Sequence, residues 1–477
     1  MTQTNGETSG VVTRDNDPIF EPLKFRTVTV KNRIFRSNIS GRFDNYDGTG
    51  SRARINWELK FARGGVGGII TSFVPVHGKG RILPNYARID TNDKIPFWQE
   101  LARSVHQYDC RLFIQLSHSG RQRDLPSLEY PGPAVSSTSK PEDLHGLECR
   151  AMTIDEIHEI VGHFAEGARR AREAGADGVE LHGANGYLFT QFLSSAINDR
   201  KDEYGGPLEN RARFAREVVR AIRKRVGKDF HVQYKISATE YNDALFPWAR
   251  RGNTLDDSVQ VMKWLEDDGI DAVHVSSGSS FPHPHNPGGG FPPNADKIYD
   301  VMINSGKHTA RNYWLFNHWP FFGLFQWWWK RRGGPANPEG ANLPDAARMK
   351  QELKVPVICT GGFQTASVIR AALTGGMTDA VSIARPLVAN NDLVKMFADG
   401  LDRAPRPCTY CNKCLGQVLK NPLGCYEESR FESYDAMIHE IMTVFEPQAY
   451  TETYDITTTK DERPGRWRAT RNGEAKP

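Results

Sequence analysis

Residues 178–227 read GVELHGANGYLFTQFLSSAINDRKDEYGGPLENRARFAREVVRAIRKRVG. The opening run is short and largely apolar, ends at His182 and predicts a β-strand. A polar loop follows. From Glu209 the apolar residues have helical spacing, and the pattern stops at Gly227 just after a basic turn. The stretch therefore predicts a strand, a polar loop and a helix in that order.

The same alternation of strand and helix recurs along the chain. Helical patterns are also present in IHEIVGHFAEGARRAREAG and QTASVIRAALTGG, and each stops at glycine. Eight such units favour a closed parallel (β/α)8 TIM barrel over an open doubly wound α/β sheet. The predicted strands are Arg33–Asn38, Gly68–Val74, Arg111–Ser117, Gly178–His182, His231–Ser237, Ala272–Ser276, Val355–Thr360 and Ala380–Ala384.

Two regions of the sequence are additional to a minimal TIM barrel. One is an insertion between the sixth and seventh strands, at about residues 281–345, and the other is the tail beyond Arg403. We expect a leader at 1–17, a barrel at 18–403 and a C-terminal extension at 404–477. The glycine cluster Gly64–Gly68 precedes a strand, whereas a dinucleotide-binding fingerprint follows one, so we interpret it as a turn.

Charge and composition indicate which classes of protein do not fit this sequence. The 477 residues include 61 Lys and Arg against 57 Asp and Glu, for a net charge of +4. This near balance does not provide the concentrated positive charge that binds nucleic acid. The polar N-terminal residues lack the apolar run of a secretory signal and predict a disordered leader, and the polar C-terminal end is expected to fray. Seven cysteines, an odd number, favour a reducing, cytoplasmic compartment.

Three polar side chains follow the strand that ends at His182. At the rim of a barrel, His182 and Asn185 could both donate hydrogen bonds to a carbonyl oxygen, and Tyr187 could deliver a proton. The alternative is that all three are satisfied polar groups in a turn. Residue types alone leave these two interpretations open.

The surrounding motifs resemble the old yellow enzyme family of flavin-dependent oxidoreductases. Its signature matches HGANGYL and NDRKDEYGGPLENRARF within residues 182–214. Further matches are PLKFRTVTVKNRI (Pro22–Ile34), QLSHSGRQ (Gln115–Gln122), CTGGF (Cys359–Phe363) and DAVSIARPL (Asp379–Leu387). The resemblance covers residues 18–403.

The resemblance implies FMN as cofactor, NAD(P)H as reductant and an activated alkene as substrate. His182 and Asn185 would bind the electron-withdrawing group, hydride would reach the β-carbon, and Tyr187 would protonate the α-carbon. The physical reasoning agrees, because two preplaced donors stabilise the negative charge that develops on the carbonyl oxygen.

The resemblance also assigns cofactor-binding residues. Gln115 matches a glutamine at the flavin ring, and Arg385 supplies a charge-assisted fork to the flavin phosphate. Small residues beside it let backbone N–H groups approach that phosphate. Two positions depart from the family: Ser40 stands where relatives place Thr or Cys, and Lys235 stands where most have Arg. The cofactor-binding residues are therefore Ser40, Gln115, Lys235, Gly361, Gly362, Ala384 and Arg385.

Four cysteines cluster in the tail as Cys408-x₂-Cys411-x₂-Cys414-x₁₀-Cys425. The spacing is typical of a metal or cluster site. It resembles the iron–sulfur motif of the 2,4-dienoyl-CoA reductase and trimethylamine dehydrogenase branch, which would imply a 4Fe-4S cluster. A structural zinc site and a relic with free thiols are the two alternatives.

The insertion contains NYWLFNHWPFFGLFQWWWKRR at Asn312–Arg332, with ten aromatic residues and three basic ones at its end. It is too short and too interrupted to span a bilayer. Tryptophans beside basic residues suit peripheral membrane contact, and a hydrophobic lid or a homo-oligomer contact is the alternative.

The leading hypothesis is thus an FMN-dependent ene-reductase or dienoyl-type reductase that acts on a small molecule. An amine demethylase or dehydrogenase of the trimethylamine dehydrogenase type is the second. A membrane-attached flavoprotein without catalytic role is the third, and the intact Tyr187 and Arg385 count against it.

Overall fold

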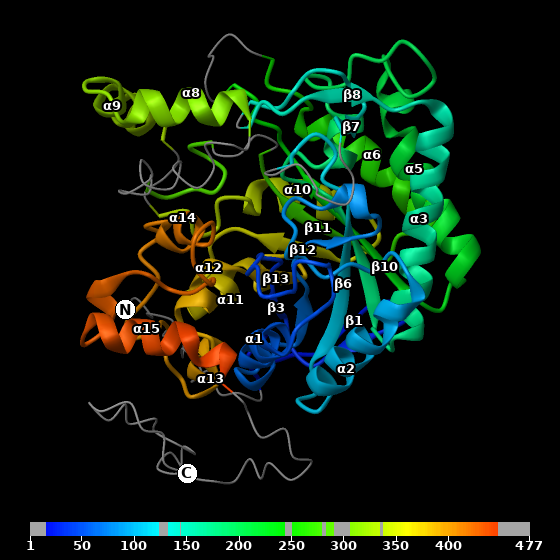
Figure 1. Cartoon of the computed structure of the whole chain (residues 1–477). Helices are drawn as coiled ribbons and strands as arrows, with labels where there is room; N and C mark the ends of the chain where they lie inside the picture. The colour runs from blue at the N-terminus through cyan, green and yellow to red at the C-terminus, as the bar shows by residue number, and fades with distance from the viewer. Residues whose placement is uncertain are drawn as a thin grey trace, which may run out of the picture.

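The computed structural model describes residues 16–123, 132–143, 145–243, 250–278, 283–290, 306–333 and 337–446. Its centre is a ring of eight parallel strands (Figure 1). The pairings of β13 with β3 and of β4 with β6 close the ring. In ring order the strands are β3 (Ile34–Arg36), β4 (Gly68–Ile70), β6 (Arg111–Ser117), β9 (Gly178–Gly183), β10 (His231–Ser237), β11 (Ala272–Ser276), β12 (Val357–Thr360) and β13 (Ala380–Ile383).

The predicted TIM barrel is confirmed. Each of the eight predicted strands overlaps one strand of the ring, and β6, β10 and β11 have the predicted bounds. These strands are easy to recognise because parallel strands covered on both faces read as short, nearly continuous runs of apolar residues. β13 (AVSI) is such a run, with three apolar residues out of four, and all four are buried.

Helices cover the outside of the barrel (Figure 1). Reciprocal side-chain caps start α3 at Thr153 and Glu156 and α6 at Thr254 and Asp257. The helices around the barrel are α1 (Arg52–Arg63), α2 (Ile95–His106), α3 (Ile154–Glu173), α4 (Leu188–Leu193), α5 (Leu208–Val226), α6 (Leu255–Asp268), α10 (Leu343–Glu352), α11 (Ala366–Thr374), α12 (Arg385–Ala389) and α13 (Leu393–Ala398).

The two ends of the barrel differ in chemistry. A hairpin of β1 (Leu23–Lys24) and β2 (Thr29–Val30) closes the N-terminal end, where Phe25 packs against Phe35 and Phe113 at centroid distances of 6.1 and 6.5 Å. Nearer the C-terminal ends, the strands carry buried polar residues, namely Gln115, Ser117, His182, Lys235 and Ser237. The barrel therefore offers its polar end to a ligand, as TIM barrels do.

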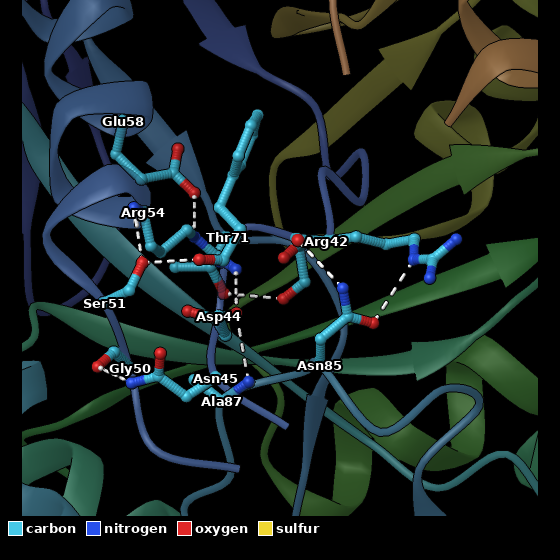
Figure 2. Close-up of polar contacts among 12 residues, drawn as sticks. Arg42, Asp44, Asn45, Gly50, Ser51, Arg54, Glu58, Thr71, Asn85 and Ala87 are labelled. Carbon is cyan, nitrogen blue, oxygen red and sulfur yellow. Dashed lines mark hydrogen bonds and ion pairs between the residues drawn. The ribbon is translucent and has the colours of Figure 1, made fainter. Parts of the chain in front are cut away.

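A buried network of ion pairs fastens the segment after β3 to α1 (Figure 2). The guanidinium of Arg54 lies 3.1 Å from Asp44 and 2.9 Å from Glu58, and Glu58 lies 3.0 Å from Arg36. All four side chains are at most 3% exposed. The backbone N–H of Ala87 donates to the same oxygen of Asp44 at 3.0 Å.

The predicted insertion between the sixth and seventh strands contains α8 (Lys307–Phe316) and α9 (Phe321–Arg332). These helices lie at the same end of the molecule as the pair β7 (Ala134–Ser136) and β8 (Cys149–Ala151) (Figure 1). His308 Nδ1 lies 3.0 Å from the carbonyl oxygen of Glu142. No helix among the described residues is long and apolar enough to cross a bilayer.

The C-terminal extension includes α14 (Lys413–Gln417) and α15 (Tyr434–Met442), the second of which lies beside α1 and α13 (Figure 1). The Asn56 amide on α1 donates to the carbonyl of Val444 at 2.8 Å. Residues 1–15 of the predicted leader and residues 447–477 of the predicted extension lie outside the described residues. The expected domain boundaries stay predictions.

Candidate active site

The predicted catalytic residues lie where β9 leaves the barrel. Lys235 on β10 is the direct cross-strand partner of His182 on β9, and Gln115 on β6 is the partner of Glu180 on β9. Side chains from three neighbouring strands thus meet at one end of the ring. This is the rim at which TIM barrels carry their chemistry.

His182 is a neutral hydrogen-bond donor. Its Nδ1 lies 3.1 Å from the Ser117 hydroxyl, and its Nε2 lies 3.3 Å from Asn185 Oδ1. Burial lowers the pKa of His182 to about 3, and the charge of Lys235 adds to this effect. Because the Asn185 oxygen can only accept, Nε2 carries the proton and the Ser117 hydroxyl donates to Nδ1.

Asn185 is held by its backbone. Its φ of 61° lies in the left-handed region, which Asn tolerates better than most residues. Its N–H donates to the Ser237 hydroxyl at 3.2 Å, and its side-chain amide donates to Asn286 Oδ1 at 3.4 Å. The turn therefore presents the amide group beside the His182 ring.

Tyr187 packs close to both groups. Its ring centroid is 4.7 Å from that of His182 and 4.9 Å from that of Phe73. Burial raises the pKa of Tyr187 far above its ordinary value, so the phenol keeps its proton at neutral pH. The three predicted catalytic residues are thus brought together by the fold.

A layer of polar groups inside the barrel connects two predicted cofactor residues. Asn38 accepts from Lys235 Nζ at 2.5 Å and donates to Gln115 Oε1 at 3.1 Å. Gln115 in turn donates to Glu180 at 2.8 Å. We did not predict Asn38 or Glu180 from the sequence. The only signal for either was its polar type at or near the end of a predicted strand.

Glu180 is the buried counter-charge of Lys235. Burial alone would raise the pKa of Glu180, but His274 and Lys235 lower it to about 2. The carboxylate accepts from Gln115, from Gln233 at 2.6 Å and from His274 at 2.7 Å. Burial lowers the pKa of Lys235 to about 8, and Glu180 opposes that change.

This donor set fits a flavin. Lys235 is 3% exposed and has three N–H donors, and Asn38 is its hydrogen-bond acceptor among the described residues. A buried cation with spare donors suits a ligand that carries acceptor atoms and negative charge. Ser40 is half-buried, and no hydrogen bond between described residues joins it to this layer. Its role stays a prediction.

The predicted phosphate residues lie at the ends of β12 and β13. Gly362 has a φ of 69°, and a Cβ there would lie 3.0 Å from the Pro338 carbonyl, so the position requires glycine. Gly361 precedes it, and Ala384 precedes α12. Arg385 donates to the Gly288 carbonyl at 2.6 Å and also bonds Asn412. Phosphate binding by these residues stays a prediction.

The four clustered cysteines line one cavity together with Arg385. Cys408 and Cys411 lie on the loop between α13 and α14, Cys414 lies in α14, and Cys425 lies between α14 and α15. Sulfurs around a tetrahedral zinc lie about 3.8 Å apart, given Zn–S bonds of about 2.3 Å. Within the described part of the chain, no three of these sulfurs lie within 4.8 Å of one another. Whether these four cysteines hold an iron–sulfur cluster, a zinc ion or free thiols stays a prediction.

Comparisons with known proteins agree with this geometry. A model of the NADH:flavin oxidoreductase / NADH oxidase family matches residues 18–287. NADH oxidase from Thermoanaerobacter brockii is 30% identical over 406 residues, which are 84% of this chain and 54% of that protein. Cinnamate reductase from Clostridium sporogenes is 29% identical over 408 residues, which are 84% and 56% of the two chains.

The fold is similar to that of the old yellow enzyme homologue from Zymomonas mobilis, with a TM-score of 0.61 at 22% identity. That match covers 85% of this chain and 99% of the other. The chain spans about half the length of the two relatives above. It belongs to the NADH:flavin oxidoreductase / NADH oxidase family, whose cofactor is FMN.

Proposed function

We propose that this chain reduces an alkene activated by a carbonyl group. The observation that carries the proposal is the grouping of a neutral imidazole donor, an amide and a protonated phenol at one rim. The relative named cinnamate reductase supports the same reaction class. Bound FMN would supply the hydride, which NAD(P)H replenishes.

His182 and Asn185 would bind the carbonyl oxygen of the substrate. Their mutual hydrogen bond is 3.3 Å long, and a ligand oxygen could replace it at little cost. Because the pKa of His182 is low, the imidazole donates a hydrogen bond without giving up a full proton. Both donors gain strength as negative charge develops on that oxygen, which lowers the barrier.

Tyr187 would deliver the proton to the α-carbon. Its phenol sits against the His182 ring, and burial raises its pKa, so the phenol keeps its proton. Proton donation by a positioned group contributes typically about 10²- to 10⁴-fold to a rate. Lys235 and Gln115 would hold the flavin ring beside these three residues.

Anaerobic titration of the purified protein tests the proposal. Yellow protein should be bleached by NADH or NADPH and regain its colour on addition of an α,β-unsaturated ketone or acid. Protein that stays colourless after incubation with FMN, or that is bleached and never reoxidised by any such alkene, would overturn it. Iron and acid-labile sulfide in the same sample would test the cysteine site.

Lys235 gives the first half-reaction a pH dependence. Its pKa of about 8 means that the ammonium loses its proton as the pH rises through 8, and the proposed flavin site then loses its positive charge. We expect the rate of bleaching by NAD(P)H to fall above that pH. In Lys235→Arg the charge persists and the profile should be flat. A decline of the same shape in Lys235→Arg would assign the titration to another group.

A further inference from the structure

The hairpin of α8 and α9 exposes large apolar side chains to solvent. Trp319 at its tip is 93% exposed, Leu324 57%, Trp327 55% and Trp314 53%. Several large apolar side chains exposed on one hairpin are typical of a contact with another phase or molecule. The proposed reaction uses none of these residues.

The exposure does not come from a loosely packed hairpin, because the opposite side of the hairpin is well packed. Phe316 on α8 contacts Phe322 and Phe325 on α9 at centroid distances of 5.2 and 5.1 Å, and Trp329 is buried. Arg332 anchors the end of α9 to Asp243 at 2.8 Å. The exposed rings therefore belong to a hairpin whose two helices pack against each other.

The charge of the hairpin has one sign. Residues 306–333 contain five Lys or Arg and no Asp or Glu. Lys330 and Arg331 are exposed, and the Arg331 guanidinium lies 4.6 Å from the Trp327 ring centroid. Cations and apolar rings therefore share one surface.

The combination of exposed apolar rings and cations on one surface distinguishes between two candidate binding partners, a second copy of the chain and a lipid surface. A symmetric pair of chains that meets through this surface would bring its cations against an identical set, which is repulsive. An anionic lipid surface satisfies both features, because tryptophan rings enter the headgroup layer while lysine and arginine face the lipid phosphates. We propose that the α8–α9 hairpin docks the protein onto an anionic lipid surface.

The docked surface would lie next to the active-site rim. Asp243, which anchors Arg332, is also 3.5 Å from His283, and Asn286 in the same segment accepts from the Asn185 amide. The lipid face and the site are therefore linked through adjacent contacts. The docking proposal stands on the hairpin itself and does not depend on the proposed reaction.

Vesicle sedimentation of the FMN-loaded full chain tests docking. The wild type should bind phosphatidylcholine vesicles that contain phosphatidylglycerol far better than pure phosphatidylcholine, and added salt should weaken that binding. Trp319→Ser/Trp327→Ser should bind at least about tenfold more weakly. Lys330→Glu/Arg331→Glu should bind anionic vesicles on the order of 30-fold more weakly. Arg332 is left unchanged because it anchors the helix.

Tyr46→Ser/Tyr434→Ser is the matched control, since these exposed rings lie outside the hairpin at 70% and 61% exposure. It should bind like the wild type. Equal flavin absorbance and thermal midpoints would show that all variants fold. Absence of vesicle binding by the wild type, or equal binding by the tryptophan variant, would overturn docking. Concentration-dependent dimers that this variant abolishes, without vesicle binding, would assign the surface to a second copy instead.

Discussion

Tyr187→Phe is expected to slow reoxidation of the reduced protein by an unsaturated ketone by about 100- to 10,000-fold, the range for loss of a positioned proton donor. The Tyr187 ring lies 4.7 Å from the His182 ring, centroid to centroid, and the raised pKa of the phenol keeps it protonated. Bleaching by NAD(P)H needs no such proton and should keep its rate. Stopped-flow absorbance of the flavin separates the two half-reactions.

Tyr204→Phe is the matched control for that substitution. The Tyr204 hydroxyl donates to Glu217 at 2.8 Å, and its ring packs against Phe192 rather than against the predicted catalytic residues. Both half-reactions should be unchanged. If Tyr187→Phe reoxidises at the wild-type rate, Tyr187 is not the proton donor. If bleaching slows equally, the hydroxyl is needed to hold the reductant or the flavin.

The sequence predicts well what local patterns encode. Strand bounds follow from runs of apolar residues, and His182, Asn185 and Tyr187 lie within six residues of one another, so one rim loop brings them together. The contacts of Asn38 could not be predicted in this way. It meets Lys235 and Gln115 only because β3, β6 and β10 belong to one closed ring, and ring closure is a long-range property.

Arg385 is a second example of contacts that could not be predicted from the sequence. The family motif identifies the arginine, but its partners are the carbonyl of Gly288 and the side chain of Asn412, which lie 97 and 27 residues away in sequence. The aromatic insertion is a third case. Composition shows ten aromatic residues but does not distinguish Trp329, which is buried, from Trp319, which is not. Helix packing decides that difference.

The ion-pair network of Figure 2 should give the largest effect on stability. Arg54→Met removes the cation that lies between Asp44 and Glu58, and both carboxylates are then buried with less compensation. Removing one partner of a buried pair costs about 3–5 kcal/mol in the free energy of unfolding. Urea denaturation of the wild type and of Arg54→Met at neutral pH measures this loss in the free energy of unfolding. Arg52→Met on the same helix breaks a half-exposed pair with Glu100 and should cost less than about 1 kcal/mol.

Asp44 gives this loss a pH dependence of definite sign. Burial holds the pKa of Asp44 above its ordinary value, and Arg54 opposes that rise. Without Arg54 the folded-state pKa rises further, so the folded protein retains a proton that the unfolded chain releases. The destabilisation is then greatest above that pKa and shrinks as the pH falls through it. A loss that is constant with pH, or no larger than that of Arg52→Met, would show that these carboxylates do not depend on Arg54 for their charge.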